Sequence, residues 1–214
     1  GADILFGAGG NDSLIGGIGA DTFFWGAGQG LDTIAGEGFN SRNDVVSFAA
    51  AGVRFADLAF VAGATDLGIT FTADSGLTDT LTLQDWIGQQ TLSGANANAT
   101  RLDTFQTTDL TFGLGIGTTG DDVIKGSTLA DYMSGDAGAD SLSGLGGADT
   151  ILGGAGADTV IYSAAAKVLN GGEDTDVLRG TGLIDASGYL TAGLAVGNFE
   201  VLYGDATYDS LVGW

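Results

Sequence analysis

Between residues 117 and 179, apolar and polar positions recur with a period of nine. Aligned with an aspartate in the sixth place, the segments read GTTGDDVIK, GSTLADYMS, GDAGADSLS, GLGGADTIL and GGAGADTVI, followed by the less regular YSAAAKVLN and GGEDTDVLR. The eighth place is apolar in every segment: Ile124, Met133, Leu142, Ile151, Val160, Leu169 and Leu178. This pattern predicts that each segment contributes one short strand with one inward side chain to a shared core.

A shorter copy of the pattern opens the chain, with GAGGNDSLI at 7–15 and GGIGADTFF at 16–24 after a partial segment at 1–6. Asp3 and Asp21 stand two full repeats apart. The position two repeats after Asp12 is Gly30, and the next aspartate, Asp32, comes two places late. We therefore expect regular coiling to end near residue 32.

The stretch between the two blocks lacks the nonapeptide but keeps strand-like patterns. VVSF at 45–48, LGITF at 67–71 and TLTL at 80–83 alternate in polarity or are β-branched. We expect a first repeat block at 1–35, an irregular β-rich connecting or capping segment at 36–116, and a second repeat block at 117–185. A connecting strand region and the start of a further repeat follow at 186–214. Because the first and last segments are incomplete repeats, we expect a longer protein.

Composition narrows the chemistry. The chain carries 27 acidic and 6 basic residues, for a net charge of −21, which argues against binding to nucleic acid or to an anionic membrane surface. It has 40 Gly, no Pro, no Cys and no His. Disulfides, thiolate or imidazole metal sites, cysteine nucleophiles and a Ser-His-Asp triad are therefore excluded. No apolar run is long enough to form a transmembrane segment.

The acids are almost all aspartates, 24 against 3 glutamates. Short carboxylates beside glycines suit tight loops around an ion that prefers oxygen ligands. A pair of carboxylates for glycoside hydrolysis is a weaker interpretation, because the repeat register accounts for most of the well-placed aspartates. Phosphate binding fails on charge, since these glycine-rich loops carry Asp where a P-loop carries Lys.

These segments resemble the nonapeptide G-G-x-G-x-D-x-U-x of repeats-in-toxin (RTX) proteins, a calcium-binding pattern. The resemblance covers residues 1–24 and 117–179 well. It implies an all-β fold, a right-handed parallel β-roll, in which the first six places of each repeat form a loop and the last three form a strand. Two repeats then complete one coil of the roll.

With two repeats to a coil, aspartates on the same side form rows. The first row of the second block is Asp122, Asp140, Asp158 and Asp176, and the second row is Asp131, Asp149, Lys167 and Asp185. Neighbouring coils lie about 4.8 Å apart, so stacked carboxylates repel by roughly 3 kcal/mol per pair at an effective dielectric near 20. The rows therefore require cations, and the resemblance identifies these as several Ca²⁺ ions.

The candidate ligands are carboxylates from the sixth place and, as the resemblance implies, backbone carbonyls from odd-numbered loop places. The carboxylates are those of Asp3, Asp12, Asp21, Asp122, Asp131, Asp140, Asp149, Asp158 and Asp176. The carbonyls are those of Gly117, Thr119, Gly135, Ala137, Ala139, Gly153, Ala155 and Ala157. Leu129 and Asp174 replace the fourth-place glycine, and Lys167 should abolish one site, with its ammonium as a candidate internal cation.

Two functions follow from the resemblance. The first is a non-catalytic calcium-binding module that folds after type I secretion, within an extracellular or bacterial cell-surface protein of the adhesin or surface-layer type. The alternative is the calcium-binding C-terminal tail of a secreted hydrolase or polysaccharide-modifying enzyme. A polysaccharide and neighbouring copies of the same protein are the candidate partners besides calcium. Trp86, beside Asp85, is a candidate sugar-binding aromatic, but the stronger interpretation places Trp86 and Trp25 in a β core.

Overall fold

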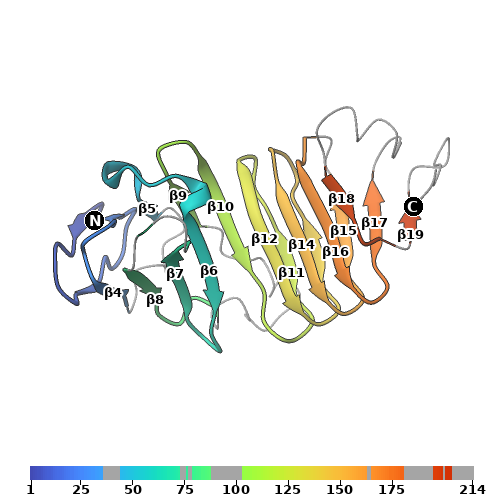
Figure 1. Cartoon of the computed structure of the whole chain (residues 1–214), viewed down its shortest axis with the longest axis horizontal. Helices are drawn as coiled ribbons and strands as arrows, with labels where there is room; N and C mark the ends of the chain where they lie inside the picture. The colour runs from blue at the N-terminus through green and yellow to red at the C-terminus, as the bar shows by residue number, and fades with distance from the viewer. Residues whose placement is uncertain are drawn as a thin grey trace. The chain divides into compact units, whose positions relative to one another are not determined.

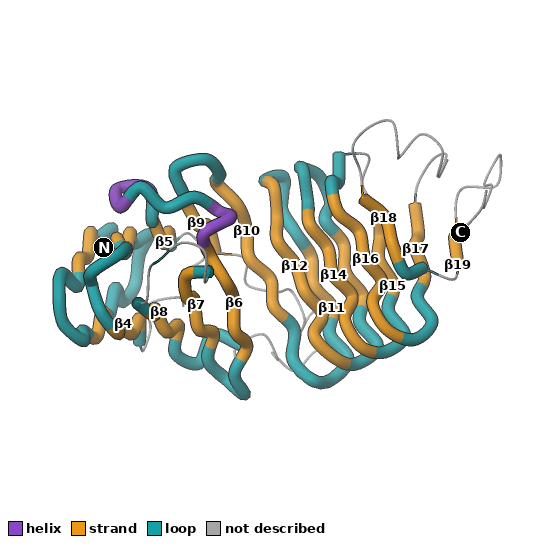
Figure 2. Tube along the Cα trace, viewed as in Figure 1, coloured by secondary structure: helices purple, strands orange, loops and turns teal. Residues whose placement is uncertain are grey.

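The computed structural model describes residues 1–35, 44–72, 76, 79–87, 103–162, 165–180, 195–199 and 201–203. The chain is nearly all β and forms two compact units (Figures 1 and 2). The first comprises 1–92 and 101–112, and the second 93–100 and 113–214. Each unit is built of stacked coils with parallel strands, so the predicted parallel β-roll is confirmed. No helix in the described residues is long and apolar enough to cross a membrane.

The second unit contains two parallel sheets. One has the order β11-β13-β15-β17-β19, and the other the order β10-β12-β14-β16-β18. The strands of the first sheet are Val123–Lys125, Ser141–Ser143, Thr159–Tyr162, Val177–Gly180 and Val201–Tyr203. Those of the second are Thr111–Ile116, Ala130–Ala137, Thr150–Ala155, Val168–Glu173 and Ala195–Gly197. Successive strands alternate between the two sheets, so every coil adds one strand to each.

The strand register confirms that two repeats make one coil. In the first sheet Val123 pairs with Ser141, Ser141 with Thr159, and Thr159 with Val177. In the second sheet Tyr132 pairs with Thr150, and Thr150 with Val168. Each step is two repeats long, so residues in the same place of every second repeat stack directly on one another.

The eighth-place side chains form the core of this unit. All seven that the periodicity predicts to point inward are at most 1% exposed: Ile124, Met133, Leu142, Ile151, Val160, Leu169 and Leu178. They belong to one buried apolar cluster, which also contains Ala166 and Phe199. One inward side chain per half-coil is therefore enough to fill the narrow interior between the two sheets.

The strands of the two sheets differ in length. In the first sheet β11, β13 and β15 match the predicted short strand closely. In the second sheet β12, β14 and β16 run on into the first three places of the following repeat. Pairing continues there from Asp136 to Gly154 and from Gly154 to Gly172. Glycines at these places let adjacent backbones approach closely enough for the ladder to extend.

The first unit keeps parallel stacking with coils of unequal length. One sheet pairs β1 (Ile4–Phe6), β3 (Thr22–Phe24), β5 (Val45–Ser47) and β9 (Asp103–Gln106). Ile4 pairs with Thr22 at the regular two-repeat spacing, but Thr22 pairs with Val45, five places later than that spacing requires. Regular spacing therefore ends as expected, but the stacking itself continues beyond residue 32.

The other sheet of the first unit joins solenoid strands to a hairpin. Its order is β2-β4-β8-β7-β6, with β2 at Ser13–Leu14, β4 at Leu31–Ile34, β8 at Thr80–Leu83, β7 at Leu67–Phe71 and β6 at Leu58–Ala62. Strands β2, β4 and β8 are parallel, whereas β7 is antiparallel to both β8 and β6. The sequence between β5 and β8 thus adds two antiparallel strands at one edge of the sheet.

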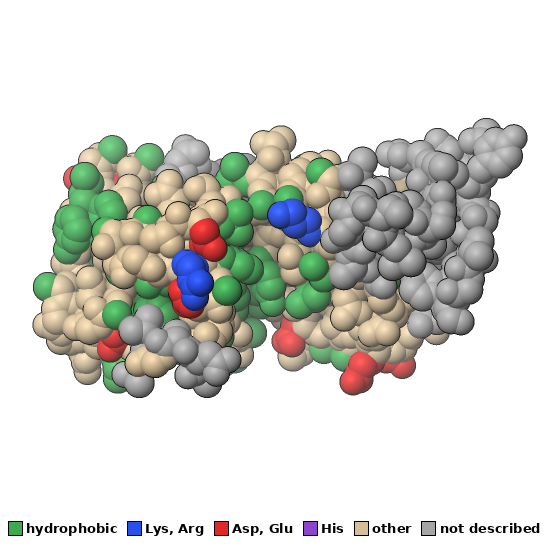
Figure 3. Space-filling view, turned by 45° about the horizontal axis from the view of Figure 1, so that its top comes forward, with side chains coloured by type: hydrophobic (Ala, Val, Ile, Leu, Met, Phe, Trp, Pro, Cys, Tyr) green, Lys and Arg blue, Asp and Glu red, His purple; other side chains and the backbone are tan. Residues whose placement is uncertain are grey.

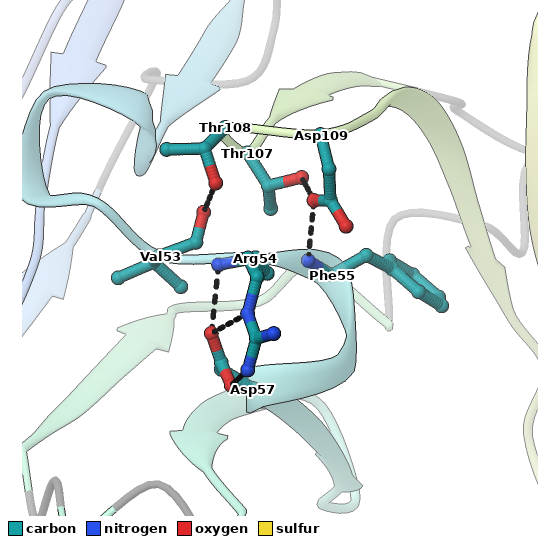
Figure 4. A network of polar contacts seen from close by, with 7 residues as sticks. All are labelled: Val53, Arg54, Phe55, Asp57, Thr107, Thr108 and Asp109. Carbon is teal, nitrogen blue, oxygen red and sulfur yellow. Dashed lines mark hydrogen bonds and ion pairs between the residues drawn. The ribbon is translucent and has the colours of Figure 1, made fainter.

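Two 3-10 turns precede β6, η2 (Ala49–Ala51) and η3 (Phe55–Asp57), and a polar network holds η3 and the residues just before it (Figure 4). The Thr108 amide and hydroxyl both donate to the Val53 carbonyl, at 2.8 and 3.0 Å. The Phe55 amide donates to Asp109 at 2.9 Å, and the Arg54 guanidinium pairs with Asp57 at 3.1 Å. The segment is therefore tied to the turn between β9 and β10.

Both candidate tryptophans are core residues. Trp25 and Trp86 are each 1% exposed, and the Trp25 ring stacks on Phe71 with centroids 5.1 Å apart. The structural interpretation of both side chains is therefore confirmed. A buried Trp86 has no face available to stack on a sugar, which removes the residue that supported a polysaccharide site.

We predict that Leu142→Ala lowers the free energy of unfolding in saturating calcium by about 2–5 kcal/mol, because it leaves a cavity in a closed core. The matched control is Leu145→Ala, the same substitution at a nearby side chain that is 62% exposed. Urea unfolding followed by circular dichroism measures both variants. Equal losses for the two would contradict the inward assignment of the eighth place.

Candidate metal centre

The first-row aspartates form a continuous ladder. The amide of Asp122 donates to Oδ1 of Asp140, that of Asp140 to Oδ1 of Asp158, and that of Asp158 to Oδ1 of Asp176, each at 2.8 Å. All four side chains are buried. The row predicted from the two-repeat spacing therefore exists as an array of carboxylates, and each one after the first is held by the backbone of the preceding coil.

The second row is shorter. The Asp131 amide donates to Oδ1 of Asp149 at 3.1 Å, and both side chains are buried. Lys167 takes the next position, where its amide donates to the Asp149 carbonyl at 2.9 Å, but its side chain is exposed. An exposed ammonium does not replace a cation inside the row. Asp185, the fourth expected member, lies outside the described residues.

The first unit repeats the ladder over one regular step and two longer ones. The Asp3 amide donates to Oδ1 of Asp21, and the Asp21 amide to Oδ1 of Asp44, at 2.8 and 2.9 Å. The Asp12 amide donates to Oδ1 of Asp32 at 2.9 Å. Asp3 lies in the first coil and its side chain is 60% exposed.

Sequence reasoning missed Asp32 and Asp44 as members of these rows, because their coils are two and five places longer than the regular ones. A signal was nevertheless present. Both aspartates stand two places before a buried apolar side chain, Ile34 and Val46, in the same relation as the sixth and eighth places of a repeat. An aspartate followed two places later by an apolar residue therefore locates the row even where the loop length varies.

The second carboxylate oxygen provides the test of whether a cation fits. Oδ2 of Asp140 and Oδ2 of Asp158 are buried and have no hydrogen-bond partner among the described residues. Oδ2 of Asp12 and Oδ2 of Asp21 are likewise buried and without a hydrogen-bond partner among the described residues. A buried anionic oxygen without a partner is costly in free energy. These atoms fit a bound cation, and their chemistry suits a hard ion such as Ca²⁺.

First-place glycines form the wall beside these oxygens. A Cβ on Gly135 would collide with Oδ2 of Asp140 and with the carbonyl oxygen of Gly153 in the next coil. A Cβ on Gly153 would likewise meet Oδ2 of Asp158 and the Gly171 carbonyl. None of these three glycines has a positive φ. Glycine is therefore needed here for space, and it brings oxygens of two successive loops to one place.

The other candidate carbonyls vary in their surroundings. Ala137 and Ala155 lie in the extended parts of β12 and β14, and the Ala155 carbonyl accepts the Gly138 amide at 2.9 Å. Thr119, Ala139 and Ala157 lie in exposed loop positions, whereas Gly117 is buried. The described residues contain no group of three or more acidic side chains that could hold a metal. Backbone carbonyls would therefore have to complete the coordination.

The two departures in the fourth place have different effects on the backbone. Asp174 has φ +76°, in the same left-handed region as the fourth-place glycines Gly138, Gly147 and Gly156. Leu129 is not among the positive-φ residues. The loop that contains Leu129 therefore has a different conformation from the regular loops.

The buried acidic side chains of the described residues all belong to these rows. The buried aspartates among the described residues are Asp21, Asp32, Asp44, Asp122, Asp131, Asp140, Asp149, Asp158 and Asp176. On the face drawn in Figure 3, acidic side chains of the described residues stand in a few separate places. Burial raises the pKa of Asp140 to about 7, opposed by the Asp122 amide and reinforced by the charges of Asp158, Asp122 and Asp121. Burial also raises the pKa of Asp158.

Comparison with known proteins agrees with this geometry. Residues 1–31 and 126–160 match the family model of the RTX calcium-binding nonapeptide repeat in four copies. RTX repeats bind Ca²⁺, and several repeats imply several ions. No curated protein matches the sequence. Among solved structures, the extracellular lipase LipA from Serratia marcescens is similar at 17% identity and a TM-score of 0.33, over 87% of this chain and 30% of the lipase chain.

We predict that calcium binding weakens as the pH falls from 8 to 6, because protons compete for Asp140, whose pKa is about 7. Without metal, a fall in pH has the opposite effect and stabilises the folded chain. The raised pKa favours the protonated folded chain, so its contribution to stability is full below the ordinary pKa of 3.8 and is lost as the pH rises through about 7. Calcium titrations at several pH values, with Asp140→Asn as control, measure this. A calcium affinity independent of pH over this range would refute it.

We predict that Gly135→Ala and Gly153→Ala each raise the calcium concentration needed for folding, because a methyl group would displace the Asp140 or Asp158 carboxylate. The control is Gly146→Ala, a loop position where nothing lies within 4 Å of an added Cβ and φ is not positive. Calcium titration followed by far-ultraviolet circular dichroism compares the variants. An equal rise in the calcium concentration needed by Gly146→Ala would show that the substitutions act through a general loss of backbone freedom.

Proposed function

We propose that the chain is a non-catalytic, calcium-binding structural module that folds when it meets Ca²⁺ after secretion, as part of a larger extracellular or cell-surface protein. The observation that carries this proposal is the row of buried aspartates in which Asp140 and Asp158 each retain an oxygen without a partner. Such a row opposes folding when empty and favours it when cations lie between the loops.

The energetics of the chain support coupling between binding and folding. A net charge of −21 and 40 glycines both disfavour compaction, the first by repulsion and the second by backbone entropy. A site formed by two successive loops does not exist in the unfolded chain, so its binding free energy becomes folding free energy.

The calcium concentration needed for folding would then lie between that of the cytosol and that outside the cell. Extracellular calcium modules bind with dissociation constants of about 10⁻⁴–10⁻³ M. With affinities of that order, the chain would remain unfolded in the cytosol, which suits passage through a narrow exporter, and would fold outside. The association of RTX repeats with type I secreted proteins supports this order of events.

The surroundings of the acids support a structural role. The first-row carboxylates are held rigidly by backbone amides and face glycine walls. Two acids of the first unit outside the rows serve local structure, with Asp57 paired to Arg54 and Asp109 bonded to the Phe55 amide. We therefore infer a scaffold and assign no catalytic group.

We predict that the chain lacks a β spectrum in a calcium chelator at neutral pH and acquires one in millimolar Ca²⁺, because only the bound ions offset the buried charge. Far-ultraviolet circular dichroism measures this directly, with Mg²⁺ at the same concentration as the control ion. A complete β spectrum in the chelator would overturn the proposed function.

We also predict that Asp140→Ala and Asp158→Ala raise the calcium midpoint of folding far more than Asp66→Ala does. Asp66 lies outside the rows, where its carboxylate accepts the Asp85 amide. Calorimetric calcium titrations give the midpoints. Equal shifts for the three variants would reject the ligand assignment of the first row.

A further inference from the structure

The first coil of the second repeat block, residues 117–134, satisfies its carboxylates differently from the coils that follow. Oδ2 of Asp122 accepts both the amide and the hydroxyl of Thr118, at 2.6 and 2.9 Å. Oδ2 of Asp131 accepts the amide of Ser127 at 2.6 Å, and the Ser127 hydroxyl lies 3.0 Å from Oδ1 and 3.3 Å from Oδ2 of the same carboxylate. The oxygen that lacks a partner in Asp140 and Asp158 is therefore bonded by the protein itself in this coil.

The two hydroxyls also organise their own loops. The Gly120 amide donates to Thr118 Oγ1 at 3.2 Å, and the Leu129 amide donates to Ser127 Oγ at 2.9 Å. Each hydroxyl therefore accepts a fourth-place amide while it donates to the sixth-place carboxylate. This closed arrangement holds the loop together without any further ligand.

Backbone conformation separates these loops from the others. Thr118 and Ser127 occupy the second place of their repeats, and neither has a positive φ. In the following repeats the second place is left-handed in Asp136, Leu145 and Gly154, with φ of 72°, 62° and 121°. A hydroxyl in the second place thus accompanies a different loop conformation, one that turns protein donors toward the carboxylate.

The first unit shows the same principle with a different donor. The indole Nε1 of Trp25 donates to Oδ2 of Asp32 at 3.0 Å, and both side chains are 1% exposed. Asp32 stands beyond the last regular nonapeptide of its block. Asp122, Asp131 and Asp32 are therefore bonded by the chain itself through their Oδ2 atoms. The carboxylates that retain an open oxygen are, in contrast, those of Asp12, Asp21, Asp140 and Asp158.

We infer that Thr118 and Ser127 close the first coil of the second block without metal, so that calcium binding begins with the loop at 135–140. This inference rests on the proposed function, because it concerns which loops of the same rows take up the ion. The hydroxyl and amide donors occupy the oxygen that a cation would need, and the closed loop gives the calcium-bound coils a preformed surface on which to stack. The number of bound ions is then smaller than the number of aspartates in the rows.

The test is a count of bound calcium on the full chain, by equilibrium dialysis against radioactive calcium at saturation. The double variant Thr118→Gly, Ser127→Gly should bind at least one more ion per chain than the wild type. The matched control is Thr128→Gly, which removes a hydroxyl and adds backbone freedom one position further along the loop of Ser127, and its count should not change. An unchanged count in the first variant, or an equal rise in the control, would overturn the inference.

A reverse experiment covers the case in which the double variant does not fold. Asp136→Ser places a hydroxyl in the second place of the loop at 135–140, and it should bind at least one ion fewer than the control Asp136→Gly. Equal counts would overturn the inference. A wild-type chain that binds no calcium would instead reject the proposed function, so the two failures are distinguishable.

Discussion

The stacking of aspartate carboxylates one coil apart is the constraint on which the rest of the structure depends. Along the ladder from Asp122 to Asp176, each carboxylate after the first receives one backbone amide from the preceding coil. That amide fixes the side chain in position but does not neutralise its charge. Repulsion of roughly 3 kcal/mol per neighbouring pair remains at an effective dielectric near 20. The fold is therefore incomplete, in energetic terms, until something positive reaches the remaining oxygens.

Glycine makes this arrangement sterically possible. Gly135 and Gly153 have no side chain where the Asp140 and Asp158 carboxylates press against the loop, so the coils can stack with their carbonyls facing the same spaces. The apolar core of the second repeat block is narrow, since each half-coil buries one eighth-place side chain. Because this core is narrow, the loops decide the balance between the folded and unfolded states. The proposed dependence of folding on calcium would follow from that balance.

Much of this could be predicted from the sequence where the period is strict. The inward positions of Leu142 and Ile151 follow from the period of nine alone. The coil of two repeats, and with it the first-row aspartates, followed from the resemblance to RTX repeats. Prediction failed where the loop length changes, because counting from Asp12 leads to Gly30, although Asp32 is the residue that joins the row. It also could not assign different roles to second-place residues, since the hydrogen bonds of Thr118 depend on a loop conformation that the repeat pattern does not specify.

A crystal structure of the chain grown in calcium tests the central claim most directly, with anomalous scattering used to identify the ion. The account predicts metal between the loops at 135–140 and 153–158, with a carboxylate oxygen of Asp140 or Asp158 at about 2.3–2.6 Å from it. Loops that hold only water, with both carboxylates bonded to solvent, would contradict it.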